Sequence, residues 1–397
     1  MSPASDDSLA VHIARREEQL VELRRDLHRH PELAFGERRT AEMVAERLHR
    51  AGLEVTTGVA VTGVVAVLRG DHPGRTIAWR ADMDALPLTE AIDVPFASGT
   101  AGVMHACGHD GHTAIAVEMA EILAARRASL PGTAVFLFQP AEEVFGGARR
   151  MIEPGVLERE RVDEIYGLHL ISRLPRGLVE MVPGVSMASA DFIDIEIRGR
   201  GGHGAVPHLA VDPIAVAAHI LVGLQDLVRA AVPAQEAAVL TIGQVEAGSA
   251  RNIIPETALL RGSLRALRER DRRELLERLT AYCAAVAAGF RAGAIVRPVG
   301  DSCPVLASGE AETARAARAL AIELGAERVV AGGPVMASDD MSLFLERVPG
   351  CFFRVGACRP GHPDPPAHHS PAFEIDDACL AVGVQAGASL LLHCLAP

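Results

Sequence analysis

Residues 105–112 place three histidines, a cysteine and an aspartate within eight positions, and glycines interrupt the stretch twice. Thiolate and imidazole are the ligands that zinc-like divalent ions prefer, and glycine lets the backbone pass close to an ion. The simpler alternative is a polar loop with incidental histidines, but a packed core does not need so many coordinating groups in one place. The stretch therefore predicts part of a metal site, which needs further ligands and a group that activates water.

Further candidate ligands follow three short apolar runs that are typical of buried strands. They are Asp82 and Asp84 after residues 76–79, Glu142 and Glu143 after residues 133–138, and His169 after residues 165–168. Open α/β sheets bind their ligands at the carboxyl ends of parallel strands. We therefore expect these side chains to meet along one edge of a sheet.

Glu142 and Glu143 are adjacent carboxylates, which repel each other unless a cation lies nearby. Neighbouring side chains diverge, so one of them can bind metal while the other accepts a proton, as hydrolysis requires. Asp82 or Asp84 could bind metal, or accept a hydrogen bond from a metal-bound histidine and fix its tautomer. The alternatives are a solvated glutamate pair and a turn aspartate that is satisfied by backbone amides.

The hydrophobic periodicity predicts the elements that must position these groups. We expect helices at residues 8–30, 40–51, 113–127, 212–227, 268–290, 311–324 and 376–392. We expect strands at residues 59–68, 76–79, 133–138, 165–168, 192–197, 238–245, 257–264, 294–299 and 351–356. His28 and His30 flank the end of the first helix, where capping or surface roles are more common than metal binding.

The order of these elements predicts two domains, which the length of 397 residues also favours. Strands that alternate with helices indicate an α/β catalytic domain, residues 1–185 and 300–397, with a mostly parallel sheet flanked by helices. Residues 186–299 follow the order β-α-β-β-α-β of a smaller ferredoxin-like α+β domain. We expect this smaller domain to be inserted between the two halves of the catalytic domain.

The formal net charge of −12 argues against nucleic acid and anionic membrane as partners. We expect a cytoplasmic protein, because no apolar run approaches a membrane span and the acidic first residues lack the layout of a signal peptide. Seven scattered cysteines without a CxxC pair do not suggest a disulfide framework. The absence of lysine excludes Schiff-base and pyridoxal phosphate chemistry and the lysine of a phosphate-binding P-loop.

Six motifs stand in order along the chain: Arg80–Pro87, His105–His112, Gln139–Glu143, Tyr166–His169, Gly201–His203 and His368–Pro371. Together they closely resemble the M20 metallopeptidase family, over about residues 20–390. The branch is that of N-acyl-amino-acid amidohydrolases, which includes hippurate hydrolases and indoleacetyl-amino-acid hydrolases. One departure from the family pattern is Ser338-Asp339-Asp340, where many relatives have Ser-Glu-Asp.

The resemblance implies a centre of two divalent metal ions (zinc, manganese, cobalt or nickel) with five protein ligands: Cys107, His109, Glu143, His169 and His369. It implies that Glu142 is the general base and acid and that Asp84 is a carboxylate behind the ligands. Cys107 and His109 can face the same way at i and i+2 in extended backbone. His105 and His112 then have supporting roles, and the role of Asp110 stays open.

The resemblance also implies that the inserted domain is a lid and a dimerisation domain. His203 would reach into the active site of a partner subunit and stabilise the oxyanion. Asn252 and Arg265 would hold the carboxylate of the substrate. We therefore expect a homodimer or higher homo-oligomer that acts on small-molecule N-acyl amino acids.

The predicted reaction is hydrolysis of an N-acetyl, benzoyl or indoleacetyl amino acid by metal-activated water, giving a carboxylic acid and the free amino acid. Two alternatives remain. One is an amidase whose nucleophile is Cys107, activated by a nearby histidine. The other is a non-catalytic metal- or amino-acid-binding protein on the same scaffold, although such a protein has no need of Glu142.

Overall fold

The computed structural model describes residues 8–362 and 364–397. The chain divides into two compact units, each assembled from segments that are distant in sequence. The larger unit comprises the described part of Met1–Ser186, with Ala307–Gly333 and Asp339–Pro397. The smaller unit comprises Met187–Leu306 and Pro334–Ser338.

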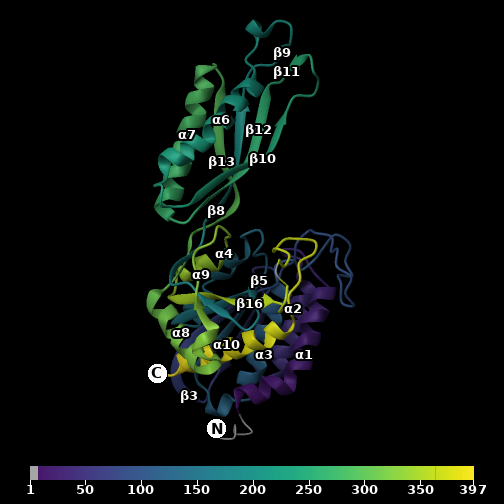
Figure 1. Cartoon of the computed structure of the whole chain (residues 1–397), viewed down its shortest axis with the longest axis vertical. Helices are drawn as coiled ribbons and strands as arrows, with labels where there is room; N and C mark the ends of the chain where they lie inside the picture. The colour runs from purple at the N-terminus through teal and green to yellow at the C-terminus, as the bar shows by residue number, and fades with distance from the viewer. Residues whose placement is uncertain (1–7, 363) are drawn as a thin grey trace. The chain divides into compact units, whose positions relative to one another are not determined.

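An eight-stranded sheet forms the centre of the larger unit, in the order β1-β2-β4-β3-β5-β16-β6-β15 (Figure 1). Its strands are β1 Glu54–Val59, β2 Gly63–Arg69, β3 His72–Asp82, β4 Pro131–Gln139, β5 Glu164–Pro175, β6 Val179–Met181, β15 Val329–Ala331 and β16 Gly350–Cys358. The central strands β4, β3, β5 and β16 are parallel, whereas β1 and β2 join antiparallel at one edge. Burial on both faces explains why β4 is a continuous apolar run from Ala134 to Phe138 and why β16 is apolar apart from Arg354.

Eight α-helices of the larger unit are described: α1 Leu9–Arg29, α2 Arg38–Arg50, α3 His109–Ala124, α4 Gly147–Ile152, α5 Val156–Arg159, α8 Glu310–Leu324, α9 Met341–Leu345 and α10 Ala378–Leu395. Short 3₁₀ turns lie at Arg127–Ser129 and Ala326–Arg328 in the larger unit and at Pro207–Leu209 in the smaller unit. Helix α3 contacts α1, α10 and β3, so nearly all of its residues are buried. Trp79, Phe136 and Phe353 from three strands share one core cluster with Ile115 of α3 and Leu380 of α10.

Two strand predictions in the larger unit were wrong in detail. Residues 59–68 form no single strand, because the chain turns back at Ala60 and Val61, both at positive φ, between β1 and β2. Strand β5 does not end before His169 but continues to Pro175. Its pairing with β3 stops at Gly167 while its pairing with β16 continues, so His169 lies where β5 parts from β3.

The smaller unit contains β8 Ala190–Arg198, α6 Pro213–Ala231, β10 Ala238–Ala247, β12 Thr257–Ala266, α7 Glu269–Gly289 and β13 Gly293–Cys303. The strands form an antiparallel sheet in the order β10-β12-β8-β13. Helices α6 and α7 contact each other and the sheet (Figure 1). A short pair in the smaller unit joins β9 Gly202–His203 with β11 Ile253–Ile254, and a second pair, β7 Gly184–Met187 with β14 Leu306–Ser308, lies where the chain passes from one unit to the other.

Two helices, α6 and α10, are long and apolar enough to cross a membrane by length and composition. The expectation that no apolar run reaches this length was therefore wrong. Most of the apolar window of α10 is buried within the larger unit. Helix α6 buries a stripe with helical spacing that includes Val216, Ile220 and Leu224. Packing within the larger unit accounts for the apolar character of α10, whereas only 28% of the apolar window of α6 is buried.

Candidate metal centre

Cys107 and His109 are positioned by the start of helix α3. His109 is the first residue of the helix, and Gly108 before it has a φ of 90°, in the left-handed region that glycine adopts readily. Glu143 follows β4, His169 lies in β5, and His369 lies in the loop before α10. The five predicted ligands thus come from four separate segments, which only the folded sheet brings together.

The five ligands form two overlapping groups around Cys107. One donor atom each from Cys107, His109 and His169 lie within 4.8 Å of one another, as do donor atoms of Cys107, Glu143 and His369. Cys107 Sγ is 3.5 Å from His169 Nε2, and Glu143 Oε1 is 3.3 Å from His369 Nε2. Cys107 is common to both groups, so the arrangement fits two ions that share the thiolate.

Hydrogen bonds fix which nitrogen of two histidines faces the centre. His109 donates from Nδ1 to the carbonyl oxygen of Asp84 at 2.9 Å, and His169 donates from Nδ1 to the carbonyl oxygen of Leu170 at 2.9 Å. In both rings Nε2 is then the atom with the free lone pair. A backbone carbonyl behind each ligand is the usual way to set the tautomer of a metal-binding histidine.

Two buried atoms of this cluster lack the hydrogen-bond partner that buried polar atoms normally have. Within residues 8–362 and 364–397, neither His109 Nε2 nor Glu143 Oε1 has such a partner. They lie 3.9 Å from each other. Thiolate, imidazole and carboxylate donors suit a divalent transition metal ion such as zinc. The residues therefore fit metal ions that would satisfy both atoms.

Asp84 holds the backbone of the carboxylate pair. Its Oδ1 accepts a hydrogen bond from the amide of Glu142, and its Oδ2 accepts one from the amide of Glu143, both at 3.0 Å. The carboxylate thus binds amides of the turn, while the carbonyl of the same residue orients His109. Asp84 supports the site from behind and is not among the grouped donors.

Glu142 is buried beside the two metal groups, with Oε2 4.0 Å from His109 Nε2. Burial raises the pKa of Glu142 well above its ordinary value, and the nearby carboxylates of Asp339 and Glu143 raise it further. Arg80 moderates this negative charge through ion pairs with Asp82 at 2.7 Å and Asp340 at 3.0 Å. A buried carboxylate that binds protons readily is suited to general base catalysis.

The remaining polar residues of the opening stretch lie outside the two donor groups that share Cys107. His112 donates from Nδ1 to Asp82 at 2.6 Å and accepts at Nε2 from the amide of Leu170 at 2.9 Å, so both of its nitrogens are engaged. His105 is buried, and neither ring nitrogen has a partner among the described residues.

Asp110 belongs to a buried ion-pair network behind the centre. It lies 2.8 Å from Arg24 and 2.7 Å from His28, which itself lies 3.0 Å from Glu90. His28 is therefore buried, and the expectation of a capping or surface role for it was wrong. His368, the first residue of the His368–Pro371 motif, also lies near the centre, with its Nδ1 3.6 Å from Cys107 Sγ.

His203, Asn252 and Arg265 all belong to the smaller unit. The pairing of β9 with β11 brings His203 opposite Ile253, next to Asn252, and both His203 and Asn252 are exposed. Arg265, in β12, donates to the hydroxyl of Ser338 at 2.8 Å and to the carbonyl of Met336 at 3.2 Å. The ligand candidates, Glu142 and Asp84 all belong to the larger unit.

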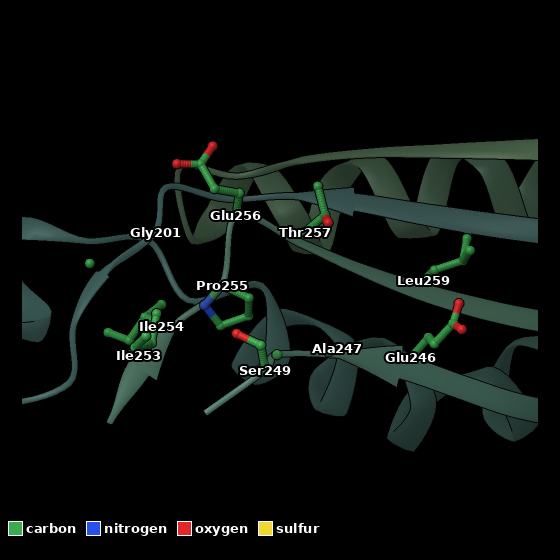
Figure 2. Close-up of a pocket in the computed structure, with 12 residues that line it drawn as sticks. Gly201, Glu246, Ala247, Ser249, Ile253, Ile254, Pro255, Glu256, Thr257 and Leu259 are labelled. Atoms are coloured by element: carbon green, nitrogen blue, oxygen red, sulfur yellow. The ribbon is translucent and has the colours of Figure 1, made fainter. Parts of the chain in front are cut away.

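An open pocket of about 760 Å³ lies in the smaller unit, beside the β9–β11 pair (Figure 2). Its walls include Gly201, Ile254, Pro255 and the acidic residues Glu246 and Glu256. It contains no basic side chain and none of the predicted site residues. An acidic pocket does not suit the carboxylate of an amino acid, so we assign no part of the predicted site to it.

Comparisons with known proteins show which family this chain resembles. Residues 78–393 match the family model described as peptidase family M20/M25/M40. N-acetylcysteine deacetylase of Bacillus subtilis is 38% identical over 94% of this chain and 96% of its own length. IAA-amino acid hydrolase ILR1-like 2 of Arabidopsis thaliana is 35% identical over 95% of this chain and 85% of its own length.

A solved structure gives the same result for the fold. The YXEP protein of Bacillus subtilis, described as a dinuclear metal-binding peptidase from the M20 family, is 36% identical to this chain. It superposes with a TM-score of 0.82 over 96% of this chain and 99% of its own. The sequence match, the shared fold and the cluster of metal-binding side chains lead to one conclusion: the chain belongs to peptidase family M20/M25/M40.

Proposed function

We propose that the protein is a metal-dependent amidohydrolase that cleaves the amide bond of N-acyl amino acids, releasing a carboxylic acid and the free amino acid. The observation that carries this proposal is the gathering of five metal-type donors and a buried glutamate around Cys107. The resemblance to an N-acetylcysteine deacetylase and an IAA-amino acid hydrolase supports the substrate class.

In this proposal Cys107, His109 and His169 hold one divalent ion, and Cys107, Glu143 and His369 hold the other. When bound, the ions polarise the amide carbonyl and lower the pKa of a water molecule toward neutrality. The thiolate favours zinc, whereas the imidazole and carboxylate donors also accept manganese, cobalt or nickel.

The residues of the chain carry the protons and hold the geometry. The Glu142 carboxylate takes a proton from the attacking water and gives it to the leaving amine. Asp84 holds the amides of Glu142 and Glu143 and so fixes the backbone that carries both carboxylates. The Asp84 carbonyl keeps His109 Nε2 turned toward the other donors.

The smaller unit supplies the substrate contacts in this proposal. His203 donates a hydrogen bond to the developing oxyanion, while Asn252 and Arg265 bind the carboxylate of the substrate. We propose that His203 acts in the active site of a partner subunit, so that the enzyme works as a homodimer or higher homo-oligomer through the smaller unit. We also propose a cytoplasmic location.

A Cys107 nucleophile is the main competing mechanism. Burial raises the pKa of the Cys107 thiol, and the nearby Glu143 carboxylate raises it further. A thiol that resists ionisation is a weak nucleophile, whereas a bound cation would stabilise its thiolate. Alkylation distinguishes the two roles, because bound metal should protect a ligand thiol, whereas a nucleophile should react regardless of chelators and trap an acyl group.

The direct test of the proposed function is hydrolysis of a panel of acetyl, benzoyl and indoleacetyl amino acids with added manganese or zinc. We expect release of the free amino acid from at least one of the three acyl classes, and loss of that release when a chelator is present. Metal-loaded protein that releases no amino acid from any class would contradict the proposed function. A non-catalytic binder would give this second result.

A further inference from the structure

Glu37 is a buried carboxylate outside the predicted site that contacts the loop carrying Glu142 and Glu143. It lies between α1 and α2 and has no exposed surface. Its Oε1 accepts a hydrogen bond from the amide of Ala141 at 2.9 Å, and its Oε2 accepts one from the hydroxyl of Thr62 at 2.5 Å. The bond to Ala141 joins residues that are 104 positions apart in sequence.

The backbone that Glu37 holds is in a conformation that non-glycine residues rarely adopt. Ala141 has a φ of 55°, and Phe35, whose amide also donates to Glu37 Oε1 at 3.1 Å, has a φ of 60°. Such left-handed conformations persist only where the surroundings stabilise them. At Ala141 the change of direction comes immediately before the proposed base and the proposed ligand.

Two buried carboxylates together bind three consecutive amides of this loop. Glu37 binds the amide of Ala141, and Asp84 binds those of Glu142 and Glu143. The loop then closes on itself, because the amide of Gly146 donates to the carbonyl of Ala141 at 3.1 Å. Glu37 therefore determines where the turn begins and Asp84 determines how it continues.

We propose that Glu37 is a positioning residue, whose hydrogen bond to the Ala141 amide sets the directions of the Glu142 and Glu143 side chains. Its effect on turnover rests on the proposed function, because it acts through Glu142. Its effect on metal binding does not, because it acts through Glu143 and can be measured on protein that hydrolyses nothing.

The contacts of Glu37 allow two properties of its side chain to be tested separately. One is its length, which lets it reach the Ala141 amide, and the other is its negative charge. Both backbone amides donate to Oε1, and Oε2 contacts only the Thr62 hydroxyl among its described partners. In E37Q the amide oxygen can keep both backbone bonds while its NH₂ group donates to Thr62. In E37D the charge remains, but the carboxylate is one methylene too short to reach Ala141.

The competing explanation is that Glu37 only stabilises the fold. Glu164 provides a matched control, because it is equally a buried carboxylate and accepts hydrogen bonds from the Tyr166 hydroxyl at 2.7 Å and from Arg75 at 2.8 Å. It lies at the amino end of β5, and within the described chain its hydrogen bonds and ion pairs join it to Tyr166, Arg75 and Arg315 and to no residue of the 141–147 loop. E164A should lower the melting temperature without changing metal affinity or the ratio of kcat to KM.

The experiment compares the variants E37D, E37Q, E37A and E164A with the wild type. The measurements are the melting temperature, the zinc affinity of metal-stripped protein by chelator competition, and kcat and KM on a substrate of the wild type. We expect E37D to lose about 10- to 100-fold in zinc affinity and in kcat with KM retained, as for other residues that orient metal ligands, and E37Q to restore both. E37A should resemble E37D if it folds.

Two results would overturn the proposal. One is an E37D protein whose zinc affinity and kcat equal those of the wild type while only its melting temperature falls. The other is an E37Q protein as impaired as E37D, which would show that charge rather than the bond to Ala141 matters. If the wild type hydrolyses nothing on the substrate panel, the proposed function fails, and zinc affinity alone still decides the role of Glu37.

Discussion

At the scale of single residues, we propose that Glu142 and Glu143 do different work, although one carboxylate oxygen of each lies within 4.8 Å of the other and of a ring nitrogen of His109. Glu143 joins Cys107 and His369 in a donor group, whereas neither group that shares Cys107 contains Glu142. We predict that Glu142→Ala keeps its metal content and loses about 10²- to 10⁴-fold in kcat, the usual contribution of a general acid–base residue. Elemental analysis checks the metal content, and steady-state kinetics on the same preparation check kcat. Retained turnover would rule out Glu142 as the base.

Cys107 is the residue on which both donor groups depend. We predict that Cys107→Ala loses both metal ions, whereas His369→Ala loses one and keeps the other, because its group still leaves Cys107, His109 and His169 intact. Metal content per subunit after dialysis measures the difference. Cys283→Ala, at a buried cysteine of the smaller unit, is the matched control and should keep both ions. Equal metal loss in the Cys107 and His369 variants would argue against a shared thiolate.

Residue types and spacing indicated a metal site within residues 105–112, because few structural roles use so many coordinating groups in eight positions, but the choice of Cys107 and His109 came from the family resemblance. They could not separate His112 from the ligands, because its exclusion depends on the amide of Leu170, 58 positions away. Glu37 gave no signal at all, since its partners Thr62 and Ala141 are distant in sequence. Ligand chemistry is visible in a sequence, whereas the groups that support the ligands depend on the folded sheet.

At the scale of elements, β5 and β16 approach closely at Gly350, where the parallel ladder pairs it with Ile165. A Cβ at Gly350 would lie 1.8 Å from the carbonyl oxygen of Ile165, so the backbone itself must shift. We predict that Gly350→Ala destabilises the protein by at least about 1–3 kcal/mol, the usual effect of overpacking. Gly289→Ala at the end of α7 meets nothing within 4 Å and should be neutral or slightly stabilising in chemical denaturation. Equal stability of the two variants would contradict this close approach.

Glu164, at the amino end of β5, should make the stability of the protein depend on pH. Burial alone would raise the pKa of Glu164, but hydrogen bonds from Arg75 and Tyr166 hold it below its ordinary value of 4.5. A lowered folded-state pKa contributes stability above the unfolded-state value, and this contribution is lost as the pH falls through about 4.5 and below. We expect Glu164→Gln to unfold with a weaker dependence on pH between about 5 and 3 than the wild type. Identical slopes would exclude this contribution of Glu164.

Most helices and strands could be predicted because the hydrophobic periodicity of each lies within its own residues. The order of strands and helices in the smaller unit is an example, since each apolar stripe lies within one element. The extent of β5 could not be predicted, because only its pairing with β16 carries it past His169 to Pro175. The β1–β2 hairpin was missed because apolar residues predominate on both sides of Ala60 and Val61, so that residues 59–68 resemble a single strand.

At the scale of the whole molecule, the proposal divides the chemistry between the two units. His203 belongs to the smaller unit and contributes to neither donor group. We predict that His203→Ala keeps both metal ions and loses about 10²- to 10³-fold in kcat, as when an oxyanion donor is removed. Mixing this variant with Glu142→Ala tests whether the residue acts in a partner subunit. Mixed dimers should recover part of the activity, and a mixture that stays inactive would contradict a shared active site.

The central claim is that two divalent ions sharing the Cys107 thiolate are required for amide hydrolysis. The most direct measurement is the metal content per subunit, followed during chelation and re-addition, alongside hydrolysis of an N-acyl amino acid in the same samples. We predict two ions in active protein, loss of activity as they are removed, and recovery as zinc or manganese returns. Hydrolysis that continues unchanged in metal-free protein would contradict it.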